Sequence, residues 1–96
     1  MELYFFGRFQ TKSGQASAFE ALLPALLHAS RTESGCLSIN IFRSLREPTL
    51  FFIHSRWQHE TAFDFHAEQP HTLEFLQNAK ALLAQLPETT RTQQFA

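Results

Sequence analysis

Apolar residues alternate with other residues in some stretches of the chain and recur every three to four positions in others. Residues 3–10 alternate, with Leu3, Phe5 and Phe9 on one face, and this period of two predicts a strand. Because both faces of the strand begin with apolar residues, we expect it to lie in the interior of a sheet rather than at an edge.

Residues 16–31 predict a helix, because apolar side chains fall three and four positions apart along them. The expected buried stripe consists of Phe19, Leu22, Leu23, Leu26 and Ser30. Pro24 lies inside this helix, where it removes one backbone donor and should kink the helix or push it outward. We expect the helix to end near Gly35, which can adopt the left-handed conformation that other residues avoid.

From Cys36 onward the period becomes two. Leu37, Ile39 and Ile41 face one way in a second strand, and residues 50–57 alternate again after a turn that contains Pro48. A strand, a short turn and another strand predict an antiparallel hairpin over residues 36–57.

The last third of the chain predicts two helices and a final strand. Residues 59–68 form the shorter helix and residues 69–86 the longer one, with Pro70 in its first turn. The stripe of the longer helix is expected at Leu76, Ala79, Leu83 and Leu86, and Pro87 ends it. Residues 90–96 alternate weakly. The order β-α-β-β-α-β predicts a ferredoxin-like α+β fold with an antiparallel sheet, and we expect residues 1–96 to form a single domain.

Composition narrows the functional classes. A net charge of −1 and the lack of any Lys or Arg run argue against binding to nucleic acid or anionic membranes. One cysteine cannot form an internal disulfide, and we see neither a signal peptide nor a long apolar run, so a cytoplasmic location without a membrane partner is expected. The 11 phenylalanines indicate either an aromatic-lined interior or a core rich in phenylalanine.

Two segments of the chain resemble the antibiotic biosynthesis monooxygenase (ABM) family, which includes small quinol monooxygenases. The matching residues are Ser30, Arg31, Glu33, Ser34, Gly35 and Cys36, followed by Trp57, Ala62, His66, Pro70 and His71. The resemblance covers about residues 3–86. It implies a ferredoxin-like domain that dimerises sheet against sheet into a barrel, with a pocket in each subunit between sheet and helices.

The chain departs from the family pattern at several positions. Ser55 stands where many members carry a glutamate, and Ile39 where many carry a tyrosine. His59 replaces the aspartate that usually caps the short helix, and histidine is a poorer cap. The haem-degrading branch depends on an asparagine in the first strand, and residues 3–10 contain none.

The resemblance implies oxygen chemistry that needs no cofactor. A phenol or quinol must first lose a proton, because its anion gives an electron to O₂ far more readily, and the site must exclude water. His66, near the end of the short helix, is favoured as imidazolium, whereas His71, in the first turn of the next helix, is favoured neutral. We therefore expect His66 and His71 to form an acid–base pair. The alternative for His66 is a hydrogen bond that fixes the loop between the helices.

Three residues are candidates for contact with a planar substrate. Trp57 and Phe63 could form a wall against its ring, and Asn40 could hold an oxygen; for Trp57 the alternative is a place in the core. Glu33 and Arg31 are expected to secure the exit of the first helix through local hydrogen bonds. We expect no metal and no cofactor, because no metal-ligand or nucleotide-binding motif occurs.

These features together favour a homodimeric, cofactor-independent monooxygenase acting on a small aromatic quinol or phenol. Two alternatives stay open. One is an isomerase that performs acid–base chemistry on a small hydroxyketone in the same pocket, and the other is a non-enzymatic dimer that binds ligands or serves in a stress response. One fold can support all three.

Overall fold

The computed structural model describes residues 1–96. Its elements are β1 (Leu3–Gln10), α1 (Ala16–Arg31), β2 (Cys36–Arg43), β3 (Leu50–Trp57), α2 (Glu60–Ala67), α3 (Pro70–Lys80) and β4 (Glu88–Thr92). The predicted order is confirmed, including the division of the second helical region into two helices. No helix combines the length and the apolar character that crossing a membrane requires.

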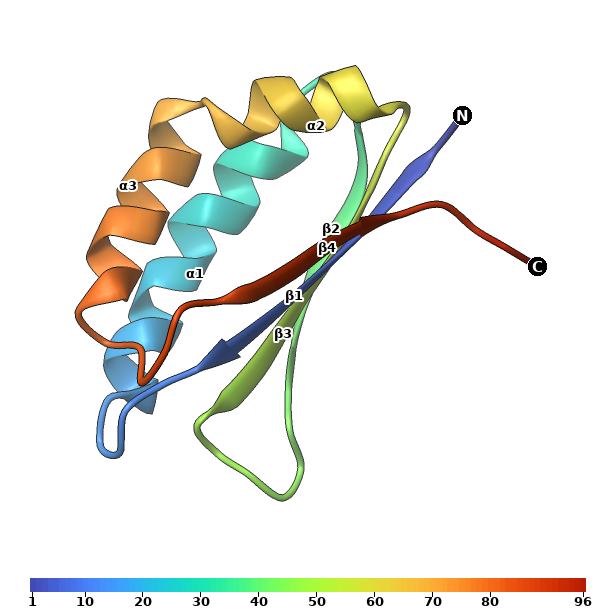
Figure 1. The fold of residues 1–96 in the computed structure, drawn as a ribbon. Coiled ribbons are helices and arrows are strands. Elements are labelled where there is room, and N and C mark those ends of the chain that lie inside the picture. Colours follow the sequence, from blue (N-terminus) through green and yellow to red (C-terminus); the bar gives the residue numbers. More distant parts are fainter.

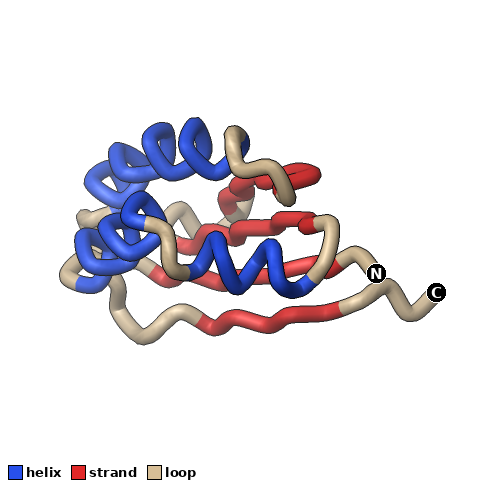
Figure 2. The backbone as a smooth tube through the Cα atoms, turned by 90° about the horizontal axis from the view of Figure 1, so that it is seen from above, coloured by secondary structure: helices blue, strands red, loops and turns tan.

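The four strands form one antiparallel sheet in the order β2-β3-β1-β4, which is the ferredoxin-like arrangement. β1 pairs with β3 on one side and β4 on the other, so its predicted interior position is confirmed. All three helices cover one face of the sheet, and the opposite face is left open (Figure 1). Seen from above, the strands run side by side and the helices lie over them (Figure 2).

The core lies between the sheet and the helix pair α1 and α3, and its centre is aromatic. Phe19 is fully buried, with ring centroids of Phe51 at 4.9 Å and Phe75 at 5.8 Å. A smaller apolar cluster of Leu3, Trp57 and Phe63 lies beneath α2. The buried side chains therefore form two groups, a large one between the sheet and the helices α1 and α3, and a small one between the sheet and α2.

The open face of the sheet carries large apolar side chains. Phe6, Phe42 and Phe52 are 51%, 55% and 39% exposed, respectively. Together with Arg8 and His54 they line a shallow hollow of about 670 Å³. His54 and Trp57 lie on opposite faces of β3, and Trp57 faces the helices.

Gly35 does not adopt the left-handed conformation that the sequence suggested. The one glycine with positive φ is Gly14, at 80°, in the turn before α1. α1 ends at Arg31 through right-handed backbone at Thr32, and Gly35 is needed for a different reason: a Cβ atom there would overlap the side chain of Ala62 on α2. Pro24 is exposed and α1 continues through it.

The second long helix is shorter than predicted. α3 ends at Lys80, because Leu83 forms a β-bridge with Thr11 and the Ala84 N–H donates to Gln10 O at 2.8 Å. These bonds return the chain to the sheet early, so β4 begins at residue 88 rather than 90. The stripe shifts accordingly: Leu86 is 80% exposed, and the buried residues of α3 are Thr72, Phe75 and Ala79.

His59 caps α2 better than was expected of a histidine in place of the usual aspartate. It is the N-cap residue of α2, and its Nδ1 accepts a hydrogen bond from the Ala62 N–H at 3.2 Å. An unprotonated ring nitrogen can therefore take the part that an aspartate oxygen usually plays at this position. The start of α2 is fixed, and with it the direction in which α2 presents its later residues.

Candidate active site

A cavity of about 370 Å³ lies between the inner face of the sheet and the helices α2 and α3. Its wall is mostly apolar and includes Phe5, Phe9, Leu26, Ile39, Ile53, Phe63, Phe75 and Leu76. Its polar lining residues are Ser55, His66, Thr72, Thr89 and Arg91. An apolar chamber with a few polar groups is the usual form of a small-molecule site. The cavity is smaller than the hollow on the open face, but its lining includes the buried His66, whereas no buried titratable group lines that hollow.

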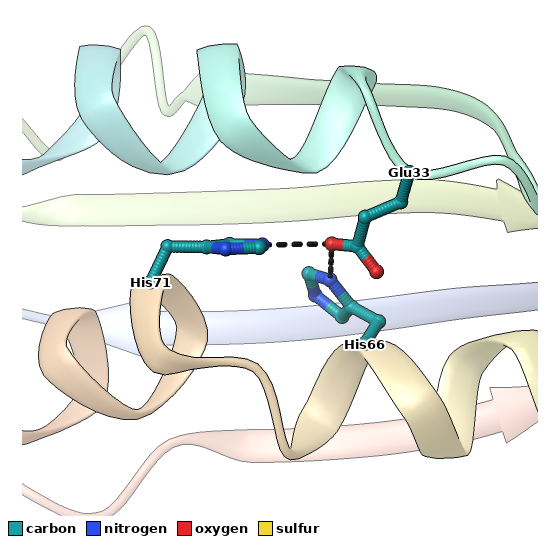
Figure 3. A group of neighbouring side chains, drawn as sticks. All are labelled: Glu33, His66 and His71. Carbon is teal, nitrogen blue, oxygen red and sulfur yellow. Dashed lines mark hydrogen bonds and ion pairs between the residues drawn. The ribbon is translucent and has the colours of Figure 1, made fainter.

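One oxygen of Glu33 joins the two predicted histidines (Figure 3). The Oε2 atom lies 2.7 Å from Nδ1 of His66 and 2.7 Å from Nε2 of His71. Because a carboxylate only accepts hydrogen bonds, both of these nitrogens carry the protons. Neutral His66 then has its lone pair on Nε2, which makes no hydrogen bond within the protein. His66 lines the cavity, so this lone pair is available to a ligand there.

Three separate segments bring these side chains together. His66 is in the last turn of α2 and His71 in the first turn of α3. The two helices are joined by a tight turn in which the Gln69 N–H donates to His66 O at 3.1 Å. Glu33 lies in the turn between α1 and β2, where its N–H donates to Ser30 O and its carbonyl accepts from the Cys36 N–H. Backbone hydrogen bonds therefore hold His66 and Glu33, and the start of α3 sets the position of His71.

Burial is the largest influence on His66. The side chain is 8% exposed, and burial lowers the pKa of His66 below its usual value because the cation would lose its hydration. The hydrogen bond that His66 donates to Glu33 opposes this effect in part. The net direction is therefore opposite to the imidazolium that was expected at the end of this helix, because burial dominates. A neutral His66 with an acceptor nitrogen in the cavity is suited to act as a base.

Trp57 packs against the ring of His66. It has no exposed surface, its Nε1–H donates to Ser55 Oγ at 2.9 Å, and its ring centroid is 4.5 Å from that of His66. The Ser55 hydroxyl accepts this bond, so its own proton is not used in it, and Ser55 also lines the cavity. Serine at this position thus anchors the indole and adds a small polar group to the cavity wall where many family members carry a glutamate.

The four remaining predicted site residues fall in four different places. Phe63 lines the cavity and stacks on Phe5 with ring centroids 4.7 Å apart. Trp57 belongs to the core and does not line the cavity, and Asn40 is exposed on β2 and paired in register with His54, away from the cavity. His71 joins the network through Glu33 but faces a small groove between α1 and α3 rather than the cavity.

Sequence reasoning underestimated Glu33. Arg31 makes the expected local bond, from Nη2 to Ile39 O at 2.9 Å, but the Glu33 carboxylate reaches both helices that follow β3. Its position two residues before Gly35 gave no sign of this contact, because the approach of Gly35 to Ala62 on α2 is seen only in the structure. Thr72 and Arg91 were also missed as lining residues. Arg91 lies at the edge of the cavity, over the ring of Phe63 at 4.8 Å.

Glu33, His66 and His71 are also the group of side chains that could offer donor atoms to a metal ion, since these atoms lie within 4.8 Å of one another. The 2.7 Å separations are those of charge-assisted hydrogen bonds. Ligand atoms that share one ion at about 2.1 Å lie roughly 3 Å or more apart. The arrangement therefore fits a hydrogen-bonded network better than a coordination sphere.

Comparison with known proteins assigns the family. The family model described as antibiotic biosynthesis monooxygenase matches residues 3–78. This match includes β1 through most of α3 and contains Glu33, His66 and His71. The chain belongs to the antibiotic biosynthesis monooxygenase family, which confirms the resemblance seen in the sequence.

Individual relatives are distant in sequence and close in fold. The Mycobacterium tuberculosis protein Rv0793 has a solved structure with a TM-score of 0.93 and 25% identity, covering 100% of this chain and 97% of its own. YcnE of Bacillus subtilis, named as a candidate monooxygenase, is 27% identical over 88% of this chain and 88% of its own length. The Synechocystis protein sll1783, which is named as uncharacterized, is 29% identical over 85% of this chain. This chain spans 56% of the length of sll1783.

Proposed function

We propose that the protein is a cofactor-independent monooxygenase that oxidises a small aromatic quinol or phenol with O₂, and that His66 is the general base. The observation that carries this proposal is the pairing of His66 Nδ1 with Glu33 at 2.7 Å beside an aromatic cavity. Because Nδ1 carries the proton in this pairing, the lone pair of the ring lies on Nε2, where it is available to a ligand in the cavity. The family supports oxygenase chemistry in general, and the site supports the choice of a substrate that must be deprotonated.

The proposed reaction begins with proton transfer. The substrate hydroxyl gives its proton to Nε2 of His66, and the imidazolium that forms is stabilised by Glu33, which already accepts its Nδ1–H. The resulting anion transfers an electron to O₂. For a quinol the overall balance is quinol plus O₂ giving a hydroxyquinone plus water, so one oxygen atom enters the ring and the other leaves as water. All four electrons come from the substrate.

The cavity wall supplies the remaining requirements. Phe63, stacked on Phe5, offers an aromatic surface to a planar ring. The apolar lining limits the water that could reach reduced oxygen species. A volume of about 370 Å³ suits a ligand of one to a few rings.

We further propose that a second copy of the chain covers the open face of the sheet, as the family resemblance implies. The supporting observation is that Phe6, Phe42 and Phe52 are exposed together on this face. Exposed apolar residues that do not belong to an interface are usually scattered singly. In this arrangement the cavity of each subunit lies on the far side of the sheet from the partner.

Oxygen uptake with a panel of quinols and phenols tests the proposed function. We expect consumption of O₂, incorporation of one ¹⁸O atom from ¹⁸O₂ into the product, and loss of both in His66→Gln. Turnover of a hydroxyketone without O₂ would instead support the isomerase. Absence of turnover with either substrate class, together with ligand binding that His66→Gln leaves unchanged, would support the non-enzymatic alternative.

A further inference from the structure

We propose that His71, which lies outside the cavity, is a positioning residue whose hydrogen bond holds the Glu33 carboxylate in the orientation that fixes the tautomer of His66. The inference rests on the proposed function because it gives His71 a purpose through the base, His66. It differs from the expected acid–base pair, in which both histidines would face the substrate. Its principal test concerns the protein without substrate.

The Glu33 side chain has two partners and no others. Its Oε1 atom is buried without a hydrogen bond, and Oε2 accepts from His66 and His71. The carboxylate is 8% exposed, so water is largely excluded from it. If His71 lost its donor, a buried carboxylate would depend on one hydrogen bond, and rotation about its side-chain torsions would then carry Oε2 away from His66.

The tautomer of His66 depends on this carboxylate. In a neutral imidazole, the neighbouring acceptor determines which of the two ring nitrogens carries the proton. Glu33 Oε2 is 2.7 Å from Nδ1, whereas the other neighbour of this nitrogen, Thr72 Oγ1, is 3.4 Å away. Without a fixed Glu33, the proton would be free to occupy Nε2, and His66 would then present a donor instead of an acceptor to the cavity.

His71 makes no hydrogen bond to His66 and is linked to it through Glu33. The ring centroids of the two histidines are 5.9 Å apart, and their hydrogen bonds meet at the one carboxylate oxygen. His71 occupies the second residue of α3, after Pro70, so its position is set by the start of that helix. The turn between α2 and α3 therefore sets the spacing of the two donors.

His71 can be reached without entering the cavity. It lines a separate groove of about 180 Å³ between α1 and α3, together with Ala25, Glu74 and Asn78. His66 is not among the residues of this groove. A small molecule that replaces the missing ring in His71→Ala could therefore enter from the groove and leave the substrate cavity unoccupied.

Nitrogen-15 NMR of the histidine side chains at about pH 8 tests the inference, because neutral imidazoles show their tautomer there. We expect His66 to be protonated on Nδ1 in the wild type and in His71→Gln, whose amide still donates to Glu33. In His71→Ala we expect a mixture of tautomers, and addition of imidazole should restore the Nδ1–H form. His28→Gln, at an exposed position on α1, is the matched control and should leave His66 unchanged.

Kinetics add a second measurement. With a quinol that turns over, His71→Ala should lower kcat about 10- to 100-fold with little change in KM, and His71→Gln should remain near the wild type. Should His71→Ala not fold, His71→Leu removes the donor while filling the space. If His71→Ala or His71→Leu folds and its His66 is still protonated on Nδ1 as in the wild type, the inference is overturned. If no quinol turns over in the wild type, the proposed function fails, and the NMR experiment still decides the role of His71.

Discussion

Gly35 lies so close to Ala62 that a Cβ atom on the glycine would overlap the alanine side chain. This contact joins the turn between α1 and β2 to the first half of α2. Glu33 lies two residues before Gly35, and His66 lies four residues after Ala62 on the same face of α2. The absence of one side chain therefore allows the approach that places the carboxylate within 2.7 Å of the imidazole.

Substitution of Gly35 tests this relationship. Gly35→Ala should lower the free energy of unfolding by about 1–3 kcal/mol, because α2 must move to admit the new methyl group. It should also disturb the His66 side-chain NMR signals, since the Glu33 turn shifts with it. Urea denaturation and the histidine spectrum measure the two effects.

The controls separate overlap from backbone strain. Gly14→Ala should cost about 1 kcal/mol through its positive φ alone, with open space around it and no change at His66. Gly35→Ala combined with Ala62→Gly should recover part of the lost stability. No recovery in the double variant would mean that the contact with Ala62 is not the reason for the glycine.

Stability should depend on pH through His66. Because burial lowers its pKa in the folded protein, the unfolded chain binds more protons than the folded one below the usual value of 6.5. The free energy of unfolding should therefore fall as the pH falls from 6.5, and be fully restored above it. The titratable neighbours that face this ring are Glu33 and His71.

The comparison with His66→Gln isolates this contribution from the carboxyl groups that titrate at lower pH. The variant should show a shallower decrease in unfolding free energy just below pH 6.5. Denaturant titrations at several pH values measure the difference. Parallel curves for the two proteins would show that His66 protonates equally in the folded and unfolded states.

Loss of the base, His66, or of its hydrogen-bond partner, Glu33, should slow turnover. His66→Gln should lower kcat by about 10²- to 10⁴-fold, the range that a positioned general base contributes. Glu33→Gln should lower it too, because the amide cannot stabilise the imidazolium and does not fix the Nδ1–H tautomer. His28→Gln should remain active. Equal rates for all three variants in an oxygen-electrode assay would remove the acid–base function from this site.

The open face of the sheet predicts self-association. Sedimentation at micromolar concentration should give a dimer, and Phe52→Glu should give a monomer because it places a charge among Phe6 and Phe42. Leu45→Glu, at a fully exposed loop position, should leave the dimer intact. A wild-type monomer at this concentration would contradict the proposed covering of the face by a second copy.

Local periodicity was sufficient to predict most of the fold. The bounds of β1, α1 and β3 match the predicted ranges, because alternating or helical burial of one face leaves a direct pattern in the sequence. The end of α3 was not predictable in this way. Leu83 and Leu86 continue its helical spacing, but the bridge from Leu83 to Thr11 depends on a partner 72 residues away.

The candidate site was predicted in part. His66 and Phe63 lie at the cavity as expected, but the link between the two histidines is Glu33, which is 33 and 38 positions away from them. Side chains so far apart leave no local signal, and a helix exit rich in polar residues has a simpler explanation in local bonds. Asn40 shows the same limit, because strand alternation alone does not reveal which face bounds a cavity. Trp57 lies on the inner face but is packed into the small apolar cluster with Leu3 and Phe63, and its alternation does not show how far the cavity extends along the strand.

The proposed function depends on Nε2 of His66 being an acceptor that meets the substrate hydroxyl. The most direct test is nitrogen-15 NMR of His66 while a quinol is added under argon, so that binding occurs without oxidation. Nε2 should move from the shift of a bare imidazole nitrogen towards that of a protonated one as the quinol saturates, and Nδ1 should remain protonated. Saturation by the quinol with Nε2 unchanged would contradict the account.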